Sequence, residues 1–226
     1  MNCEIKGGNF PVAICSMGAG EAIMCESGAM SWMNGGIRME TNTGGGLGKM
    51  LGRAFSGESL FMNRYVADSP GILALSANSP GEIRQIDITE NPIVVQKGSF
   101  LAMDESVNLD IFFQKKIGSG LFGGEGFIMN KLSGNGKALI EIDGGSVEYE
   151  LAAGEKMTID TGYLVMMDAT CSIDIVMLKG VSNILFGGEG LFNTVVTGPG
   201  RIVLQTQPLS QFASKIAQLV VNINKK

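Results

Sequence analysis

The six residues LFGGEG occur twice without change, at 121–126 and at 185–190, and a looser copy, RAFSGES, occupies 53–59. When the three copies are aligned, a phenylalanine, a glycine and a glutamate coincide. These residues are Phe55, Gly57 and Glu58, then Phe122, Gly124 and Glu125, then Phe186, Gly188 and Glu189. Three copies of one signal indicate three copies of one structural unit.

The match extends on both sides of these copies. Upstream, a glycine is followed five residues later by a methionine, in the pairs Gly28 and Met33, Gly98 and Met103, and Gly162 and Met167. Acidic or amide side chains then recur, first as Asn34, Asp104 and Asp168, and six residues later as Glu40, Asp110 and Asp174. Downstream, a turn precedes an apolar run at Pro70-Gly71, Asn135-Gly136 and Pro199-Gly200. This spacing predicts three pseudo-repeats, at 11–80, 81–144 and 145–208.

Short apolar runs bounded by glycine make up most of the chain. Examples are VAIC from Val12 and AIMC from Ala22, and Asn34-Gly35 is a two-residue hairpin signal. Thirty-three glycines and only six prolines suit turns between many short strands. The predicted fold class is therefore all-β, built from three internal repeats of short antiparallel strands.

The pattern changes after Pro208. Leu209, Phe212, Ile216, Leu219 and Val220 follow helical spacing, which predicts an amphipathic C-terminal helix over 209–222. Lys215 is the one basic residue in its body, so a membrane-surface helix is disfavoured. We expect the helix to dock on its own sheet or on a neighbouring subunit.

Composition excludes several classes of protein. The net charge of −5 and the sequence pI of about 4.9 disfavour binding to nucleic acid or to an anionic membrane. Histidine is absent, and the cysteines have no C-x-x-C spacing, so the usual zinc sites are excluded. Without a signal peptide or a membrane-spanning run, we expect a cytoplasmic protein with buried or idle thiols at Cys3, Cys15, Cys25 and Cys171.

Two glycine-rich loops resemble phosphate-binding motifs and fail as such. Around Gly48-Lys49, Thr43 stands where a P-loop needs its first glycine, and Met50 where it needs Ser or Thr. The loop 118–123 matches G-x-G-x-x-G, but a strand pattern follows it instead of the helix that a dinucleotide site requires. We predict no cofactor.

The repeated glutamates Glu58, Glu125 and Glu189 are the candidate ligand-binding residues. They could converge on a pseudo-threefold axis and bind a hard cation through carboxylate oxygens. Alternatively, each accepts backbone N–H bonds in a tight glycine turn and recurs because the turn recurs. The same two interpretations apply to Asn34, Asp104, Asp168, Glu40, Asp110 and Asp174. No asymmetric acid, base or nucleophile cluster stands apart from the repeats, so no catalytic residue is predicted. Trp32, the only tryptophan, is expected in the core or at an interface.

The segments Gly187 to Phe192, Gly198 to Gly200 and Ile202 to Gln205 resemble the mitochondrial-biogenesis family first known from altered inheritance of mitochondria in yeast. This resemblance implies a fold similar to the tryptophan RNA-binding attenuation protein, in which small β units assemble into a ring through subunit contacts. A homotrimer of three-unit chains would contain nine units. No catalytic, tryptophan-binding or RNA-binding residue carries over, because no matching motif is present.

The sequence therefore favours a non-enzymatic, β-rich oligomeric scaffold or binding protein, with a homotrimer as the expected assembly. Its partner, whether a protein or a small molecule, is not identified by any motif. The alternative is a small-ligand or metal-responsive regulator that binds at the repeated Gly-Glu turns.

Overall fold

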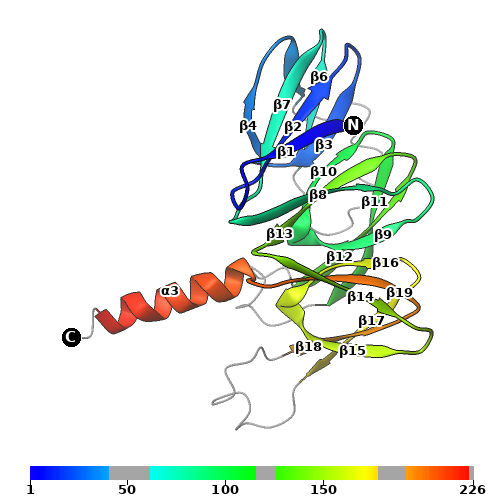
Figure 1. Cartoon of the computed structure of the whole chain (residues 1–226), viewed down its shortest axis with the longest axis vertical. Coiled ribbons are helices and arrows are strands. Elements are labelled where there is room, and N and C mark those ends of the chain that lie inside the picture. Colours follow the sequence, from blue (N-terminus) through cyan, green and yellow to red (C-terminus); the bar gives the residue numbers. More distant parts are fainter. Residues whose placement is uncertain (41–61, 116–125, 178–191, 224–226) are drawn as a thin grey trace.

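A computed structural model describes residues 1–40, 62–115, 126–177 and 192–223. These residues form nineteen strands in four antiparallel sheets, together with one long helix, α3 (Leu209–Ile223). The molecule is elongated, and its β body runs along the long axis while α3 stands out to one side (Figure 1). The mostly antiparallel β fold with a C-terminal helix is confirmed.

The first strands form one end of the body. They are β1 (Asn2–Lys6), β2 (Val12–Met17), β3 (Ala22–Glu26), β4 (Met30–Met33), β5 (Ile37–Glu40), β6 (Met62–Ala67) and β7 (Gly71–Ser76). Strand β7 lies between β2 and β4, and β6 lies between β3 and β5. Strand β1 adds to the outer edge of β2.

The middle strands follow after the turn at Pro80. They are β8 (Gly81–Asp87), β9 (Ile93–Gln96), β10 (Phe100–Asp104), β11 (Val107–Lys115), β12 (Phe127–Gly134) and β13 (Lys137–Asp143), with a 3₁₀ turn, η1, at Lys97–Ser99. Strand β13 lies between β8 and β10, and β12 lies between β9 and β11.

The last strands form the other end of the body. They are β14 (Ser146–Leu151), β15 (Lys156–Asp160), β16 (Leu164–Asp168), β17 (Ser172–Met177), β18 (Phe192–Thr197) and β19 (Gly200–Gln205), with a 3₁₀ turn, η2, at Thr161–Tyr163. Strand β19 lies between β14 and β16, and β18 lies between β15 and β17.

Two junctions join these three groups of strands. Strand β3 pairs with β10, and β9 pairs with β16, so two six-stranded sheets each cross from one group to the next. Strand β10 reads FLAMD and is buried over its first four residues, whereas β11 alternates, with Val107 and Leu109 inside and Asn108 and Asp110 outside. A strand in the middle of the body is covered on both faces, and an outer strand on one face only.

Three hydrophobic clusters fill the body, and each draws on neighbouring groups. The central cluster contains Met24 of β3, Ile140 of β13 and Val165, just after the start of β16. A second cluster packs Tyr65 and Leu73 with residues such as Leu101, and the third packs Phe127 with residues such as Ile202. Because the clusters cross the junctions, the body has a core along its whole length.

The C-terminal helix begins directly after Pro208, whose carbonyl oxygen accepts the backbone N–H groups of Gln211 and Phe212. Three further contacts hold its base: the Leu209 N–H donates to Asp143, the Tyr163 hydroxyl donates to Gln211, and the Gln211 side-chain amide donates to Asp160. The predicted position of the helix is confirmed. The helix is expected to dock on its own sheet or on a neighbouring subunit. Within the single chain its apolar side chains are exposed, so it does not dock on its own sheet, and docking on a neighbouring subunit stays a prediction.

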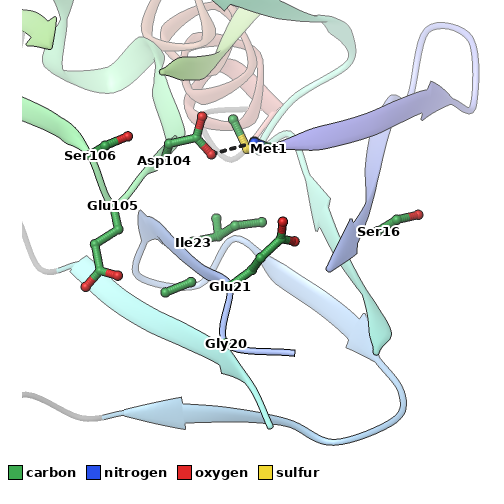
Figure 2. A pocket seen from close by; sticks show the side chains of 9 residues that line it. Met1, Ser16, Gly20, Glu21, Ile23, Asp104, Glu105 and Ser106 are labelled. Carbon is green, nitrogen blue, oxygen red and sulfur yellow. Dashed lines mark ion pairs between the residues drawn. The ribbon is translucent and has the colours of Figure 1, made fainter. Parts of the chain in front are cut away.

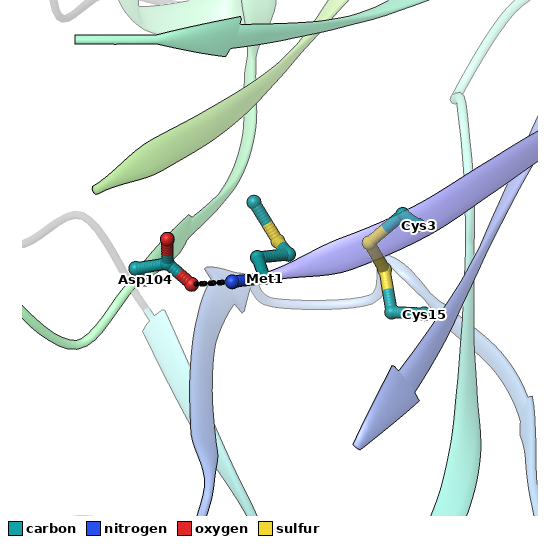
Figure 3. The surroundings of a disulfide bond; sticks show 4 residues. All are labelled: Met1, Cys3, Cys15 and Asp104. Atoms are coloured by element: carbon teal, nitrogen blue, oxygen red, sulfur yellow. Dashed lines mark ion pairs between the residues drawn. A yellow bond between two sulfur atoms is a disulfide. The ribbon is translucent and has the colours of Figure 1, made fainter. Parts of the chain in front are cut away.

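The expectation of buried or idle thiols is wrong for Cys3 and Cys15 and confirmed for Cys25 and Cys171. Cys3 of β1 and Cys15 of β2 stand directly opposite each other and form a disulfide (Figure 3). Cys25 and Cys171 are free and buried. Sequence spacing did not reveal the disulfide, because cross-strand register decides which side chains meet.

Candidate functional site

The predicted ligand residues Glu58, Glu125 and Glu189 lie outside the described residues, as do both glycine-rich loops. The structure therefore tests neither interpretation of these glutamates. The other repeated polar residues are described, and their contacts separate a backbone role from a ligand role.

Asn34, Asp104 and Asp168 each accept a backbone N–H from the strand beside them. The oxygen-to-nitrogen distances are 2.9 Å from Asn34 to Ile72, 2.7 Å from Asp104 to Lys137 and 2.9 Å from Asp168 to Arg201. Each bond ties the end of one strand to the start of its neighbour. For these three residues the backbone-acceptor interpretation is confirmed.

The repeated glycines next to these bonds have a steric role. A Cβ on Gly71 would lie 2.6 Å from the backbone oxygen of Asn34, and a Cβ on Gly136 would lie 3.0 Å from the Cβ of Asp104. A side chain at either position would push the two chain segments apart.

The second set of repeated acids has no shared arrangement. Glu40 pairs with Arg38 of the edge strand β5 and with Arg64 of the adjacent strand β6, whereas Asp174 accepts the N–H of the next residue, Ile175. Asp110 is exposed on β11. These three side chains therefore do not form one site.

A cavity of about 540 Å³ lies where the first and middle groups of strands meet. Its lining includes Glu21, Asp104 and Glu105, and the Met1 ammonium pairs with Asp104 at 2.7 Å (Figure 2). Glu105 also pairs with Arg64. The acidic groups of this cavity are thus partly neutralised by groups of the chain itself.

A second cavity, of about 460 Å³, lies at the base of α3. Its deepest charged group is Glu141, which is 5% exposed and accepts hydrogen bonds from the backbone N–H and the side-chain amide of Asn78, at 2.7 Å and 2.8 Å. Burial raises the pKa of Glu141 to about 7. Burial also raises the pKa of Glu26 on the same lining.

Other chemistry has little support in the part of the chain that the structure describes. No group of three or more His, Cys, Asp or Glu side chains there is arranged to hold a metal ion. Burial and the nearby Glu26 carboxylate raise the pKa of the Cys25 thiol to about 12, so this cysteine is a poor nucleophile. No helix among the described residues is long and apolar enough to cross a membrane.

Apolar side chains gather on α3 instead of in a pocket. Leu209, Phe212, Ile216, Leu219 and Val220 are 43–63% exposed and lie at helical spacing along one helix. Trp32 and Met33 on the edge strand β4 are exposed as well, at 47% and 38%. Trp32 is predicted in the core or at an interface; the single chain does not bury it in the core, and the interface position stays a prediction.

Three comparisons place the chain among known proteins. A family model described as "Mitochondrial biogenesis AIM24" matches residues 3–207. An uncharacterized protein of Streptococcus pyogenes serotype M6 is 31% identical over 214 residues, which cover 92% of this chain and 86% of that protein. The crystal structure of a Streptococcus pyogenes protein, SPYM3_0169, is similar with a TM-score of 0.81 and 27% identity, covering 96% of this chain and 99% of that one.

Proposed function

This chain belongs to the mitochondrial-biogenesis AIM24 family, and from that membership we propose that it is a non-enzymatic, β-rich scaffold or binding protein that works as a homotrimer. The observation that carries the proposal is the row of exposed apolar side chains along α3. Contiguous apolar surface on a folded chain commonly marks a contact with another protein.

The three-unit organisation, with boundaries at 11–80, 81–144 and 145–208, is part of this proposal. The order of strand pairing supports it. Strand β1 precedes residue 11 and is left out of the first unit, so each group then has six strands. In each group the sixth strand lies between the first and the third, and the fifth lies between the second and the fourth. The bonds made by Asn34, Asp104 and Asp168 also occupy the same place in each group.

The alternative, a small-ligand or metal-responsive regulator, has one observation in its favour. The cavity at the base of α3 contains two carboxyl groups whose pKa values are raised by burial, Glu26 and Glu141, and perturbed carboxyl groups often lie at functional sites. The repeated Gly-Glu turns, on which the sequence interpretation rests, lie outside the described residues.

Native mass spectrometry of the gently purified protein tests the proposal. The expected result is a species with three times the chain mass of 23.8 kDa and no additional bound mass. A monomer at micromolar concentration would overturn the homotrimer. A stoichiometric extra mass that is retained through purification would instead favour the ligand-binding alternative.

A further inference from the structure

The two junctions inside the chain follow one rule. At the first, Met24 of β3 stands opposite Met103 of β10, and at the second, Val94 of β9 stands opposite Met167 of β16. Both pairings are antiparallel. In each case the second strand of one group pairs with the third strand of the group that follows.

Under this rule, one strand at each end of the body has an edge without a partner strand among the described residues. Strand β4 is the third strand of the first group, and β7 is its only partner among the described strands. Strand β15 is the second strand of the last group, and in the same described residues it pairs only with β18. Figure 1 shows β4 and β15 at opposite ends of the long axis.

The side chains of β4 are far more exposed than those of β10 and β16, the third strands of the other two groups. Ala102 and Met103 on β10 are 0% and 4% exposed, and Met166 and Met167 on β16 are 1% and 0% exposed. The residues at the corresponding positions of β4, Trp32 and Met33, are 47% and 38% exposed. The third strand of each group has a β-bulge where it pairs with the sixth strand of that group. The bulge lies between residues 30 and 32 in β4, 100 and 102 in β10, and 164 and 166 in β16, so these positions correspond.

The side chains of β15 are likewise more exposed than those of β9, the second strand of the middle group. Ile93, Val94 and Val95 of β9, which pairs with β16, are almost fully buried. On β15, Met157 is partly buried and Thr158 is exposed, although Ile159 is already covered by the body. Both free edges therefore carry apolar residues that suit a junction, and neither is covered by a further strand within the described residues.

From these two edges we propose that β15 of one copy pairs antiparallel with β4 of a second copy, continuing the rule of the internal junctions. The inference rests on the proposed homo-oligomer and names its interface. The register of the internal junctions sets Ile159 opposite Trp32 of the next copy, Thr158 opposite Met33, and Met157 opposite Asn34.

The backbone of β4 is oriented for this contact. The Asn34 N–H donates to Ile72 of β7 at 3.1 Å. Because N–H groups alternate sides along a strand, the Met33 N–H points away from β7, toward the free edge. An exposed strand edge with apolar side chains is an aggregation risk, which pairing with a defined partner removes.

The contact is heterologous, since each copy uses β4 on one side and β15 on the other. Such contacts form a closed ring when the rotation between copies sums to a full turn, and a filament when it does not. For the proposed homotrimer, this contact would join three copies into a closed ring of nine units.

A charge-swap series tests the interface, with the native mass spectrum as the measurement. In the double variant Met33→Lys/Thr158→Lys, every β15–β4 contact sets two lysines directly opposite each other, and we expect a threefold drop in mass to the monomer. In Met33→Lys/Thr158→Glu, opposite charges face each other across the same contact, and we expect the wild-type mass to return. Val176→Lys is the matched control, because Val176 is 40% exposed on another edge strand, β17, and we expect it to leave the mass unchanged.

The outcomes separate this inference from the proposed function. If wild type is oligomeric and the double-lysine variant keeps its mass, the β15–β4 interface is wrong and the oligomer stands. Dissociation by the Val176 control, or no recovery in the Lys/Glu variant, also overturns the interface. A monomeric wild type overturns the oligomer and this interface together.

Discussion

At the scale of single residues, Glu141 is a buried carboxylate in a chain that has no histidine. Few other groups change charge between pH 5 and pH 8 in such a chain, because histidine is the side chain that normally titrates there. The two hydrogen bonds from Asn78 offset only part of the cost of burying the charge, since the pKa is still raised to about 7.

This raised pKa makes stability depend on pH in a definite direction. Above the ordinary pKa of 4.5 the unfolded chain releases the proton of residue 141, whereas the folded chain holds it until about pH 7. The contribution of Glu141 to folding is therefore largest below pH 4.5 and is lost as the pH rises through 7.

We expect Glu141→Gln to remove this dependence. The free energy of unfolding of wild type minus that of the variant should fall by up to about 3 kcal/mol between pH 4.5 and pH 8. Denaturant titrations at several pH values measure this difference, and Glu90→Gln, at an exposed carboxylate, is the control. A difference that stays constant with pH would contradict a pKa near 7.

At the scale of elements, the third strand of each group ends on a side chain that accepts a backbone N–H. Asn does this at position 34, and Asp does it at 104 and 168. The need is therefore for an oxygen acceptor, and a negative charge is not required. The ion pair from Asp168 to Arg201, at 3.6 Å and partly exposed, adds little.

We expect Asp168→Ala to lower the free energy of unfolding by about 1–3 kcal/mol, because the Arg201 N–H loses its acceptor. Asp168→Asn should lower the free energy of unfolding by clearly less, since the side-chain oxygen of Asn34 accepts the equivalent backbone N–H in the first group. Urea denaturation compares the two variants, and Asp110→Ala at an exposed position is the control. Equal losses for Ala and Asn would show that the charge matters and the acceptor does not.

Contacts within the single chain stabilise the helix α3 only at its first turn. The contacts of Leu209 and Gln211 hold its first turn, while the side chains of Phe212, Ile216 and Leu219 are exposed. Helical stability in proteins comes mostly from packing of an apolar face. The helix therefore fits an assembled protein better than an isolated chain, in line with the proposed function.

At the scale of the whole molecule, Trp32 reports on assembly because it is the only tryptophan. It is 47% exposed in one chain and belongs to the proposed β15–β4 contact, opposite Ile159 of the next copy. Tryptophan is common at protein interfaces, where its ring is removed from water.

We expect tryptophan emission of the wild-type oligomer to lie at shorter wavelength, and to be less quenched by acrylamide, than that of Met33→Lys/Thr158→Lys. The reason is that the second copy covers the indole ring in the oligomer alone. Identical emission and quenching in the two proteins would place Trp32 outside the interface.

The sequence by itself determined the local features of this protein. Glycine-bounded apolar runs predicted strands, and the spacing of Leu209, Phe212 and Ile216 predicted the helix. These features depend on neighbours in the chain, which a sequence pattern records directly.

Only the tertiary structure decided which residues meet across strands. It joined Cys3 to Cys15, buried Glu141 beside Asn78, and left Trp32 at an uncovered edge. Each of these outcomes depends on register and on the order of strands in a sheet. A shift of one residue in register exchanges the inner and outer faces of a strand, and no local pattern specifies that choice.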